Sequence, residues 1–581
     1  MFRTAAILLL SVALTACHTR THPPRPRVGL ATATSSTPPP MAITLAPQIN
    51  PADLVRYGQT LTSPALAGRK PGTRGEIRTT DYLIAQLRRM HLAPGYRGRW
   101  RQPVPMVSTQ LLNTGVQLRV RTPAGVQRLA YGTEMLAGTQ QARARVALRN
   151  SPVVFVGYGI DAPGRHWNDY RGVDLRGKTV LVLSNDPGYT TGNPQLFNGR
   201  SMSAYGRARD KFAAAARRGA AACFIIHAAP GSALPWSVLR DEHAGAAQAL
   251  PARVAPGPRL AVAGWIDQAA AERLVHAAGA SLRALMRAAA RPGFQPVPLD
   301  ATASITLHSA IRYSWSDNVL ALIRGAVHPD QAVIYSAHWD GLGVALGPRG
   351  RAERFPGAID NAVGVGALLE IADTFAQRKR PPARSILFLL PTLGDAGQLG
   401  SRYYVEHPVF ALDRTVADIN IDTWPVIGRA RDMTVFGATG GSELDTDLRQ
   451  VLALQGRVLT TDPDPQIGSF YRSDQYSFAR VGVPAIFAAP GLDLVGGGRA
   501  AGQADWENYL VHRFHTPRDT FNPHWHLSGT LEDIETLYLL GRTLANGTQW
   551  PNWGSDSPYR ARRDALMAQR RAPQAPSPSA P

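Results

Sequence analysis

The sequence predicts an α/β fold in which a mostly parallel β-sheet is sandwiched by helices and a smaller module is inserted. Two regions support this prediction. From about residue 305 to 550, segments with helical spacing separate four short, almost wholly apolar runs, at 332–337, 385–390, 416–421 and 483–488. From about 151 to 295, strand-like and helix-like segments alternate again. Continuous apolar strands separated by helices are typical of a parallel sheet covered on both faces.

The individual elements follow from local patterns. The folded part is expected to start near Asn50, and Leu83, Ile84, Leu87 and Met90 have the spacing of one helix face. Residues 103–150 contain short alternating segments that predict strands. In the later region, a helix is expected over 362–375, with its apolar face formed by Val365, Leu368, Leu369, Ala372 and Phe375.

The stretch 151–295 predicts a small α/β module of its own. Val153–Val156 is a buried strand that runs into a glycine turn, and residues 180–183 form a second strand. Residues 211–218 have helical character, and a further apolar run follows Gly219. Cys223 lies within that run and is interpreted as a small buried apolar residue. The predicted divisions are therefore 49–150 and 305–553 for the main domain, with 151–295 inserted between them.

The N-terminus predicts export. A basic start at Arg3 and an apolar run from Ala5 to Leu14 describe a signal sequence over 1–16. The following Leu-Thr-Ala-Cys resembles a bacterial lipobox, which makes Cys17 the expected lipidation site; an ordinary signal sequence is the alternative. We therefore expect a lipid-anchored protein of the bacterial envelope, at the outer membrane facing the periplasm, or otherwise a secreted one. Residues 17–48, rich in Pro, Thr and Ser, predict a tether, and the basic segment 554–581 a disordered tail.

The formal net charge is +21, but the arginines are spread along the whole chain without an aromatic-interleaved patch. This distribution favours a solvated basic surface, near an anionic membrane, over a nucleic-acid partner. With only Cys17 and Cys223 present, lipidation of the first leaves no disulfide within the chain. The oligomeric state is not predicted by these features.

Polar residues with metal-binding chemistry follow the apolar runs. In parallel sheets, ligands bind beyond the carboxyl ends of the strands. Two imidazoles and three carboxylates suit zinc or a similar divalent ion, and one carboxylate can bridge two ions. We therefore predict a site for two divalent metal ions, with zinc expected, at His338, Asp360, Asp395, Asp422 and His515.

Five segments in this order resemble the M28 family of zinc aminopeptidases. They are His338-Trp339-Asp340-Gly341-Leu342-Gly343, Gly357-Ala358-Ile359-Asp360-Asn361-Ala362, Gly397-Gln398-Leu399-Gly400-Ser401, Asn420-Ile421-Asp422 and Phe514-His515-Thr516-Pro517. The resemblance covers about 50–550, and the insert resembles a protease-associated domain, which caps or shapes a substrate cleft. It implies a zinc-exopeptidase-like fold and the release of N-terminal residues from peptide substrates by metal-activated water.

The resemblance also implies a role for each residue. His338 and Asp422 match the ligands of one metal, Asp395 and His515 those of the other, and Asp360 the bridging carboxylate. Asp340 matches the acid that orients a ligating histidine. Family members usually carry Glu-Glu where this chain has Gly394-Asp395. The first Glu is the general base, so the catalytic base is absent at Gly394, and the ligand Asp395 is one methylene shorter.

Several alternatives remain open at the sequence level. His512 competes with His515 as a ligand, and Asp474, Glu406 or Glu507 could replace the missing base. The leading interpretation is a metallo-aminopeptidase with weak or lost activity. The second is a non-catalytic envelope lipoprotein that binds metal or peptides on the same fold, and a third is an aminoacyl cyclase or amidase.

Overall fold

The computed structural model describes residues 46, 49–112, 115–228, 235–243, 245–346, 351–437 and 441–571. The signal sequence, Cys17 and nearly all of the expected tether lie outside the described residues, so lipid anchoring and the envelope location stay predictions. Among the helices of the described ranges, none combines the length and the apolar character needed to cross a membrane.

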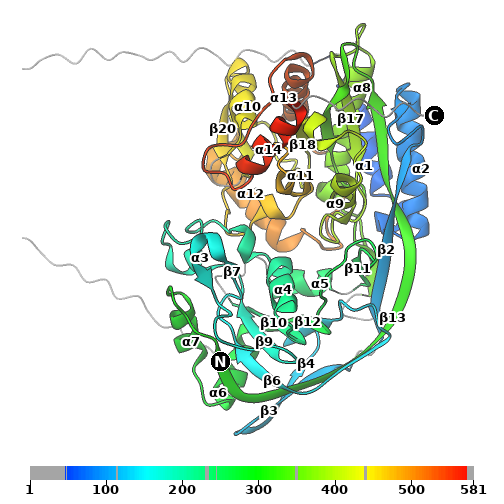
Figure 1. Cartoon of the computed structure of the whole chain (residues 1–581). Helices are drawn as coiled ribbons and strands as arrows, with labels where there is room; N and C mark the ends of the chain where they lie inside the picture. The colour runs from blue at the N-terminus through cyan, green and yellow to red at the C-terminus, as the bar shows by residue number, and fades with distance from the viewer. Residues whose placement is uncertain are drawn as a thin grey trace, which may run out of the picture. The chain divides into compact units, whose positions relative to one another are not determined.

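The predicted α/β class is confirmed by the main sheet (Figure 1). Its four central strands are parallel, in the order β17–β14–β18–β21, and antiparallel strands extend both edges. From edge to edge the strands are β11 (Ala247–Ala249), β2 (Arg101–Leu111), β13 (Val297–Ile323), β17 (Arg384–Leu390), β14 (His328–Ser336), β18 (Thr415–Asn420), β21 (Ala485–Pro490), β19 (Asp432–Val435) and β20 (Val458–Thr461). The short β1 (Ala93–Pro94) also pairs with β13.

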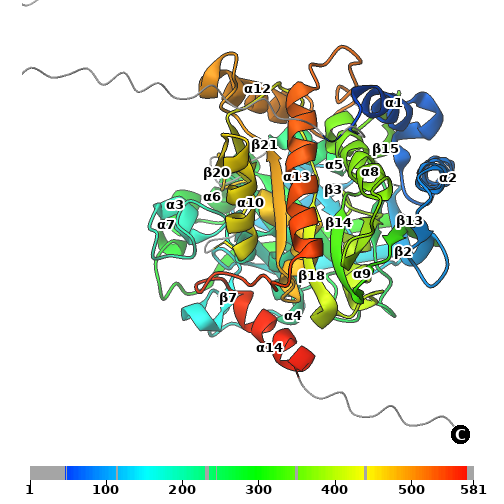
Figure 2. The ribbon, with the colours of Figure 1, turned by 90° about the horizontal axis from the view of Figure 1, so that it is seen from above.

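Helices cover both faces of this sheet, as its uniformly apolar strands require. Alternate residues of β14 show the two faces: Tyr335 belongs to the larger core, and Ile334 packs in a second core with Tyr404 and Phe478. Figure 2 shows α13 and α10 lying over the strands on one side. The larger core includes residues of α1 (Pro51–Leu61), α2 (Arg74–Arg89), α8 (Val363–Ala376), α10 (Glu443–Leu454), α12 (Gly498–His512) and α13 (Ser528–Asn546); the second core includes α9 (Leu399–Glu406) and α11 (Gln475–Arg480).

A second sheet forms the inserted module, a name used here for residues 117–307. The long strand β13 belongs to both sheets: its first part pairs with β6, and from Ser309 onward it pairs with β2. Figure 1 shows β13 and β2 side by side between the two sheets. The second sheet runs β4 (Gly125–Ala130), β3 (Gln117–Thr122), β13, β6 (Arg145–Phe155), β9 (Thr179–Leu183), β10 (Ala222–His227), β12 (Val262–Asp267) and β5 (Met135–Gly138).

Strands β3, β4 and β5 join the second sheet although they precede residue 151, where the sequence places the start of the insert. Alternation of apolar and polar residues identifies a strand but not the sheet to which it pairs. The module also contains α3 (Pro187–Thr191), α4 (Ala208–Arg217), α5 (Trp236–Glu242), α6 (Gln268–Ala277) and α7 (Leu282–Ala289), and the short pair β7 (Asp161–Ala162) and β8 (Trp167–Asn168). Its relation to protease-associated domains stays a prediction.

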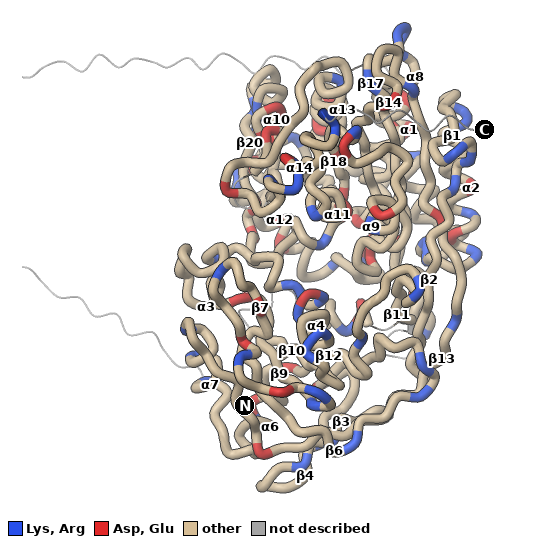
Figure 3. The backbone as a smooth tube through the Cα atoms, in the orientation of Figure 1, with Lys and Arg blue, Asp and Glu red and all other residues tan. Residues whose placement is uncertain are grey.

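The prediction of a disordered tail from residue 554 is wrong for residues 560–571, which form α14 (Arg560–Arg571). Arg563 explains why this basic segment folds. Its guanidinium is buried and donates hydrogen bonds to the carbonyl oxygens of Pro551, Thr415 and Val416. Composition alone misses such an anchor. In the described residues, Lys and Arg are spread over both the main domain and the inserted module, as the sequence indicates (Figure 3).

Candidate metal centre

The five predicted ligands come from three connections that follow strands of the main sheet and from one late loop. His338 lies two residues beyond β14, Asp395 follows β17, and Asp422 lies two residues beyond β18. Asp360 follows the hairpin of β15 (Gly343–Leu346) and β16 (Ala352–Phe355) and precedes α8, and His515 follows α12. Because β14, β17 and β18 are parallel neighbours, their carboxyl ends meet at one edge of the sheet and bring these side chains together.

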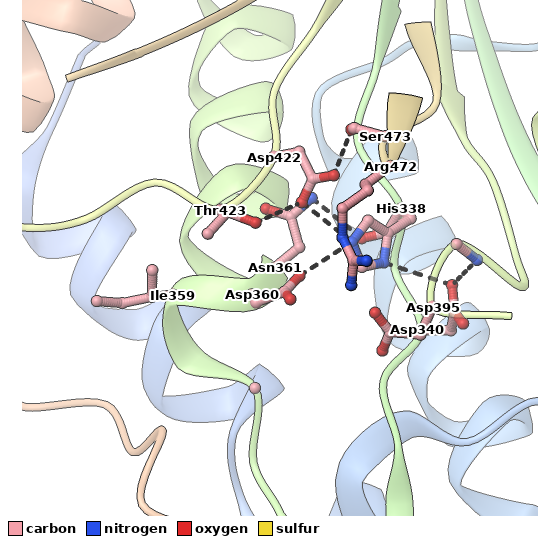
Figure 4. A network of polar contacts seen from close by, with 12 residues as sticks. His338, Asp340, Ile359, Asp360, Asn361, Asp395, Asp422, Thr423, Arg472 and Ser473 are labelled. Atoms are coloured by element: carbon pink, nitrogen blue, oxygen red, sulfur yellow. Dashed lines mark hydrogen bonds and ion pairs between the residues drawn. The ribbon is translucent and has the colours of Figure 1, made fainter. Parts of the chain in front are cut away.

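The five residues form two groups that share Asp360. One group is His338, Asp360 and Asp422, and the other is Asp360, Asp395 and His515; in each, the candidate ligand atoms lie within 4.8 Å of one another. Asp360 presents a different oxygen to each histidine: Oδ1 lies 3.2 Å from His338 Nε2, and Oδ2 lies 2.9 Å from His515 Nε2. Figure 4 shows His338, Asp360 and Asp422 directed toward one another. This is the arrangement of a bridging carboxylate.

The spacing of the donor atoms fits a divalent ion. Tetrahedral coordination at about 2.0–2.2 Å places ligand atoms about 3.3–3.6 Å apart. His338 Nε2 lies 3.2 Å from Asp422 Oδ1, and His515 Nε2 lies 3.6 Å from Asp395 Oδ1. We call the pair His338 and Asp422 the inner half of the centre, and the pair Asp395 and His515 the outer half. Imidazole with carboxylate is a donor set that suits zinc and similar ions.

The acidic neighbours of both histidines favour the protonated imidazole. Burial lowers the pKa of His338, but Asp422, Asp340 and Asp360 outweigh burial and raise its pKa well above the usual value. The same balance, with Asp360, Asp395 and Glu242 as the acids, raises the pKa of His515. A bound metal ion would compete with protons for both imidazoles.

The inner half is supported by residues of the main domain. Asp340 Oδ1 lies 3.5 Å from His338 Nδ1 and accepts a 2.9 Å hydrogen bond from the Gly394 amide. Asp422 accepts hydrogen bonds from the hydroxyls of Ser473 and Thr423 (Figure 4). Such partners fix the orientation of metal ligands. The role expected for Asp340, beside the distal nitrogen of His338, is therefore compatible with its position.

Gly394 lies directly against His338. A Cβ placed on Gly394 would lie 2.5 Å from His338 Cγ and 2.6 Å from His338 Cβ. These distances are far below normal van der Waals contact, and the colliding atoms are close to the backbone of His338. The imidazole thus occupies the space into which a side chain at position 394 would project. The glycine removes the expected general base and is also required for the observed position of a ligand.

Hydrogen bonds to the backbone of Asp360 and of its neighbours fix the position of the shared carboxylate. Asp519 accepts hydrogen bonds from the amides of Ile359 and Asp360, and burial raises the pKa of Asp519 to about 6. The peptide bond between Asp360 and Asn361 is cis. The side-chain amide of Asn361 donates a 2.9 Å hydrogen bond to the Ile421 carbonyl. The loops that carry Asp360 and Asp422 are therefore joined directly.

Arg69 hydrogen-bonds to the two loops that carry His338 and Asp360. Its buried guanidinium donates hydrogen bonds to the carbonyl oxygens of Trp339 at 2.9 Å, next to His338, and of Gly357 at 2.9 Å, three residues before Asp360. Burial lowers the pKa of Arg69. One side chain thus ties the His338 loop to the Asp360 loop.

Comparison with known proteins agrees with this geometry. A family model described as Peptidase family M28 matches residues 318–538. Residues 318–538, which we call the M28 region, are therefore similar to peptidase family M28. The match contains all five ligand positions of the M28 region. Its start falls within β13, after the end of the inserted module, so the module lies wholly outside the match.

Curated relatives match only part of this chain. "Aminopeptidase NAALADL1" of Mus musculus is 33% identical over 139 residues, 22% of this chain and 17% of the relative. "Transferrin receptor protein 2" of Homo sapiens is 30% identical over 186 residues, 29% of this chain and 22% of the relative. The matches thus span about a fifth of the length of these relatives.

One solved structure shows that the fold extends beyond the M28 match. The aminopeptidase from Aneurinibacillus sp. strain AM-1 aligns over 87% of this chain and 96% of its own, with a TM-score of 0.51 and 19% sequence identity. At this identity the likeness concerns the fold alone. It supports the α/β architecture with a mostly parallel main sheet.

The structure also places the alternative residues that the sequence left open, namely His512 as a ligand and three acids as a replacement base. His512 is exposed at the end of α12, whereas His515 lies beside Asp360. Glu406 pairs with Arg402 and Glu507 with Gln503, and neither belongs to the metal-ligand groups found among the described residues. Asp474 is buried and accepts a 2.5 Å hydrogen bond from Ser401; burial raises the pKa of Asp474 to about 7.

Sequence reasoning missed several residues that touch the ligands, and Glu242 is the most distant of them in the sequence. Glu242 of α5 lies 2.8 Å from His515 Nδ1. Nothing in its local sequence points to a metal site, because the contact joins residues 273 positions apart. The contact of Ser473 with Asp422 is likewise visible only in the folded chain.

Proposed function

We propose that this protein is a metal-dependent hydrolase of the aminopeptidase type, which binds two divalent ions, with zinc expected, and acts on the N-terminal residues of peptides with low turnover. The observation that carries the proposal is the pair of ligand groups that share Asp360, with one carboxylate oxygen facing each histidine. The M28 match over the same residues supports the peptidase class.

The residues of the chain suit this chemistry in defined ways. When bound, two divalent ions would acidify a water molecule and polarise a scissile carbonyl. His338 and Asp422 would bind one ion, Asp395 and His515 the other, and Asp360 both. Asp340 would keep the ring of His338 in its binding orientation.

Low turnover follows from the residue at position 394. A general base typically contributes about 10²–10⁴-fold to the rate. Gly394 supplies no base, and the imidazole of His338 fills the adjacent space. Among the candidate replacements for the base, Asp474 is buried and its carboxylate is engaged by Ser401. We therefore place the rate well below that of an enzyme with a glutamate at this position.

A second candidate function is metal or peptide binding without catalysis. The same glycine favours it, because a complete ligand set does not require a base. One of the relatives bears the name of a receptor instead of an enzyme, which shows that the match alone does not decide between the two functions.

The deciding experiment measures metal and turnover on the same preparation. The purified protein is stripped with a chelator, reloaded with Zn²⁺, and analysed for bound metal by mass spectrometry. Hydrolysis of a panel of aminoacyl-p-nitroanilides is then followed before stripping, after stripping and after reloading. We expect about two ions per chain and slow hydrolysis that disappears with the metal and returns with it.

The other outcomes are equally informative. Two bound ions with no hydrolysis of any substrate would favour the binding function over the enzyme. A chain that takes up no metal would contradict both candidate functions. Hydrolysis that survives complete removal of metal would contradict the metal-dependent mechanism.

A further inference from the structure

A segment of the inserted module reaches into the main domain next to the outer half of the metal centre. We call the described residues 235–243 and 245–250 the arm; they contain α5 and β11. At its start, Trp236 donates a 3.0 Å hydrogen bond to the Gly132 carbonyl of the inserted module. Val238 is buried within the core of the main domain. At its end, β11 pairs with β2 in the main sheet. The arm is therefore fixed to both parts of the molecule.

Glu242, the last residue of α5, faces the centre. Its Oε1 lies 2.8 Å from His515 Nδ1 and 3.2 Å from the Arg472 guanidinium. The opposite ring nitrogen, His515 Nε2, faces Asp360 and Asp395. Glu242 therefore stands behind the ligand, on the side away from the metal position. It approaches His515 much as Asp340 approaches His338, but more closely.

The charge of Glu242 suits this position. Burial raises its pKa, but His515, Arg472 and His243 outweigh burial and lower the pKa to about 2. The Arg472 guanidinium, 3.2 Å from Glu242, favours the ionised carboxylate independently of any proton on His515. An ionised acid behind a ligating histidine accepts the N–H of the distal nitrogen, fixes the tautomer and orients the ring toward the metal.

The inserted module contacts the second ligand of the outer half as well. The Arg209 guanidinium, at the start of α4, donates a 3.0 Å hydrogen bond to the Gly397 carbonyl, two residues beyond Asp395. Arg207 lies 3.5 Å from the Gln398 side chain in the same loop. Both ligand-bearing loops of the outer half therefore contact the module.

We propose that Glu242 is a positioning residue for the metal ligand His515, so that docking of the arm sets the metal affinity of the outer half without setting that of the inner half. The inference rests on the metal-binding part of the proposed function. It assigns the inserted module a part in forming the metal centre.

The test is a metal titration of the full chain. Metal-stripped wild type, Glu242→Ala and Glu242→Gln are titrated with Co²⁺, and the two affinities are resolved by calorimetry and by the visible absorption of the bound ion. Glu272→Gln is the matched control, because Glu272 is an exposed acid on α6 of the same module. Thermal unfolding of each protein is recorded in parallel.

We expect Glu242→Ala to weaken one of two sites about 10–100-fold, the range typical for loss of such a partner, and to leave the other unchanged. Glu242→Gln, which keeps an acceptor oxygen but loses the charge, should weaken the same site less. Glu272→Gln should bind both ions as the wild type does. A single weakened site at unchanged unfolding temperature supports the positioning role.

Three results would overturn the proposal. Unchanged affinities in both Glu242 variants would show that His515 needs no support from the arm. Equal weakening of both sites together with a lower unfolding temperature would show that Glu242 only stabilises the fold. A wild type that binds no metal would remove the proposed function itself, and this inference with it, which distinguishes that failure from the other two.

Discussion

The two halves of the metal centre use the same residue types but are built differently. His338 and Asp422 follow two parallel neighbours of the main sheet, and their partners Asp340 and Ser473 belong to the main domain. Asp395 and His515 lie in loops that the inserted module contacts through Arg209 and Glu242. Local sheet geometry therefore suffices to place the inner half. The outer half also depends on how the inserted module docks on the main domain.

The largest effect on metal affinity is expected at Asp360, the ligand that both halves share. Asp360→Ala removes an oxygen ligand from each metal, so we expect both metal affinities to fall more than about 100-fold. This exceeds the loss typical for a residue that only hydrogen-bonds to a metal ligand. Asp373→Ala, further along α8 and partly exposed, is the control and should bind two ions. Titration of the stripped proteins with Zn²⁺ in competition with a chromogenic chelator measures both. Retention of one tight site in Asp360→Ala would mean that the two halves bind metal independently.

Gly394→Ala should act mainly on the inner half. The added Cβ collides with His338 near its backbone, so we expect a loss of stability of about 1–3 kcal/mol, typical of overpacking, and weaker binding at the His338 site. Urea unfolding and metal titration measure the two effects. Gly138→Ala is the matched control, since a Cβ there meets nothing within 4 Å.

The same collision predicts that Gly394→Glu will not act as a simple restoration of the missing base. Displacement of His338 should cost metal before the new carboxylate can assist hydrolysis. A Gly394→Ala variant with unchanged unfolding and two tight sites would contradict this assignment, and would leave the lost base as the only consequence of the glycine.

The smallest difference between the two halves should come from a change at Glu370, which lies in α8 and belongs to neither ligand group. It is buried and accepts a 2.9 Å hydrogen bond from the Asn50 amide. Burial, with Asp53 and Asp373 nearby, raises the pKa of Glu370 to about 8, from an ordinary value of 4.5. Its neutral form is the one that the fold favours. The contribution of neutral Glu370 to the free energy of unfolding is therefore complete below pH 4.5 and is lost as the pH rises to about 8.

Glu370→Gln stays neutral at every pH and should escape this loss. The stability of the variant relative to wild type should therefore rise between pH 4.5 and 8, by on the order of a few kcal/mol. Urea unfolding at pH 4.5, 6 and 8 measures the trend, and the ratio of the two metal affinities should not change. A stability difference that is flat with pH would contradict the raised pKa of Glu370.

Sequence patterns predicted the inner half more completely than the outer half. Apolar runs located β14, β17 and β18, and the residues just beyond them supplied His338, Asp395 and Asp422. The choice between His512 and His515 depended on family resemblance until the structure placed His515 beside Asp360. The helix at 560–571 was missed, because the buried contacts of Arg563 with residues about 150 positions away leave no local signal.

The sequence by itself determined the α/β class, the positions of the central strands along the chain and the candidate ligand residues that follow them. These features depend on local hydrophobicity and on the geometry of parallel sheets, which short segments encode. Only the tertiary structure placed Glu242 behind His515, joined β3, β4 and β5 to the second sheet, and showed the imidazole of His338 in the space beside Gly394. Each of these is a contact between residues far apart in the chain, and such contacts form only when separate elements pack together.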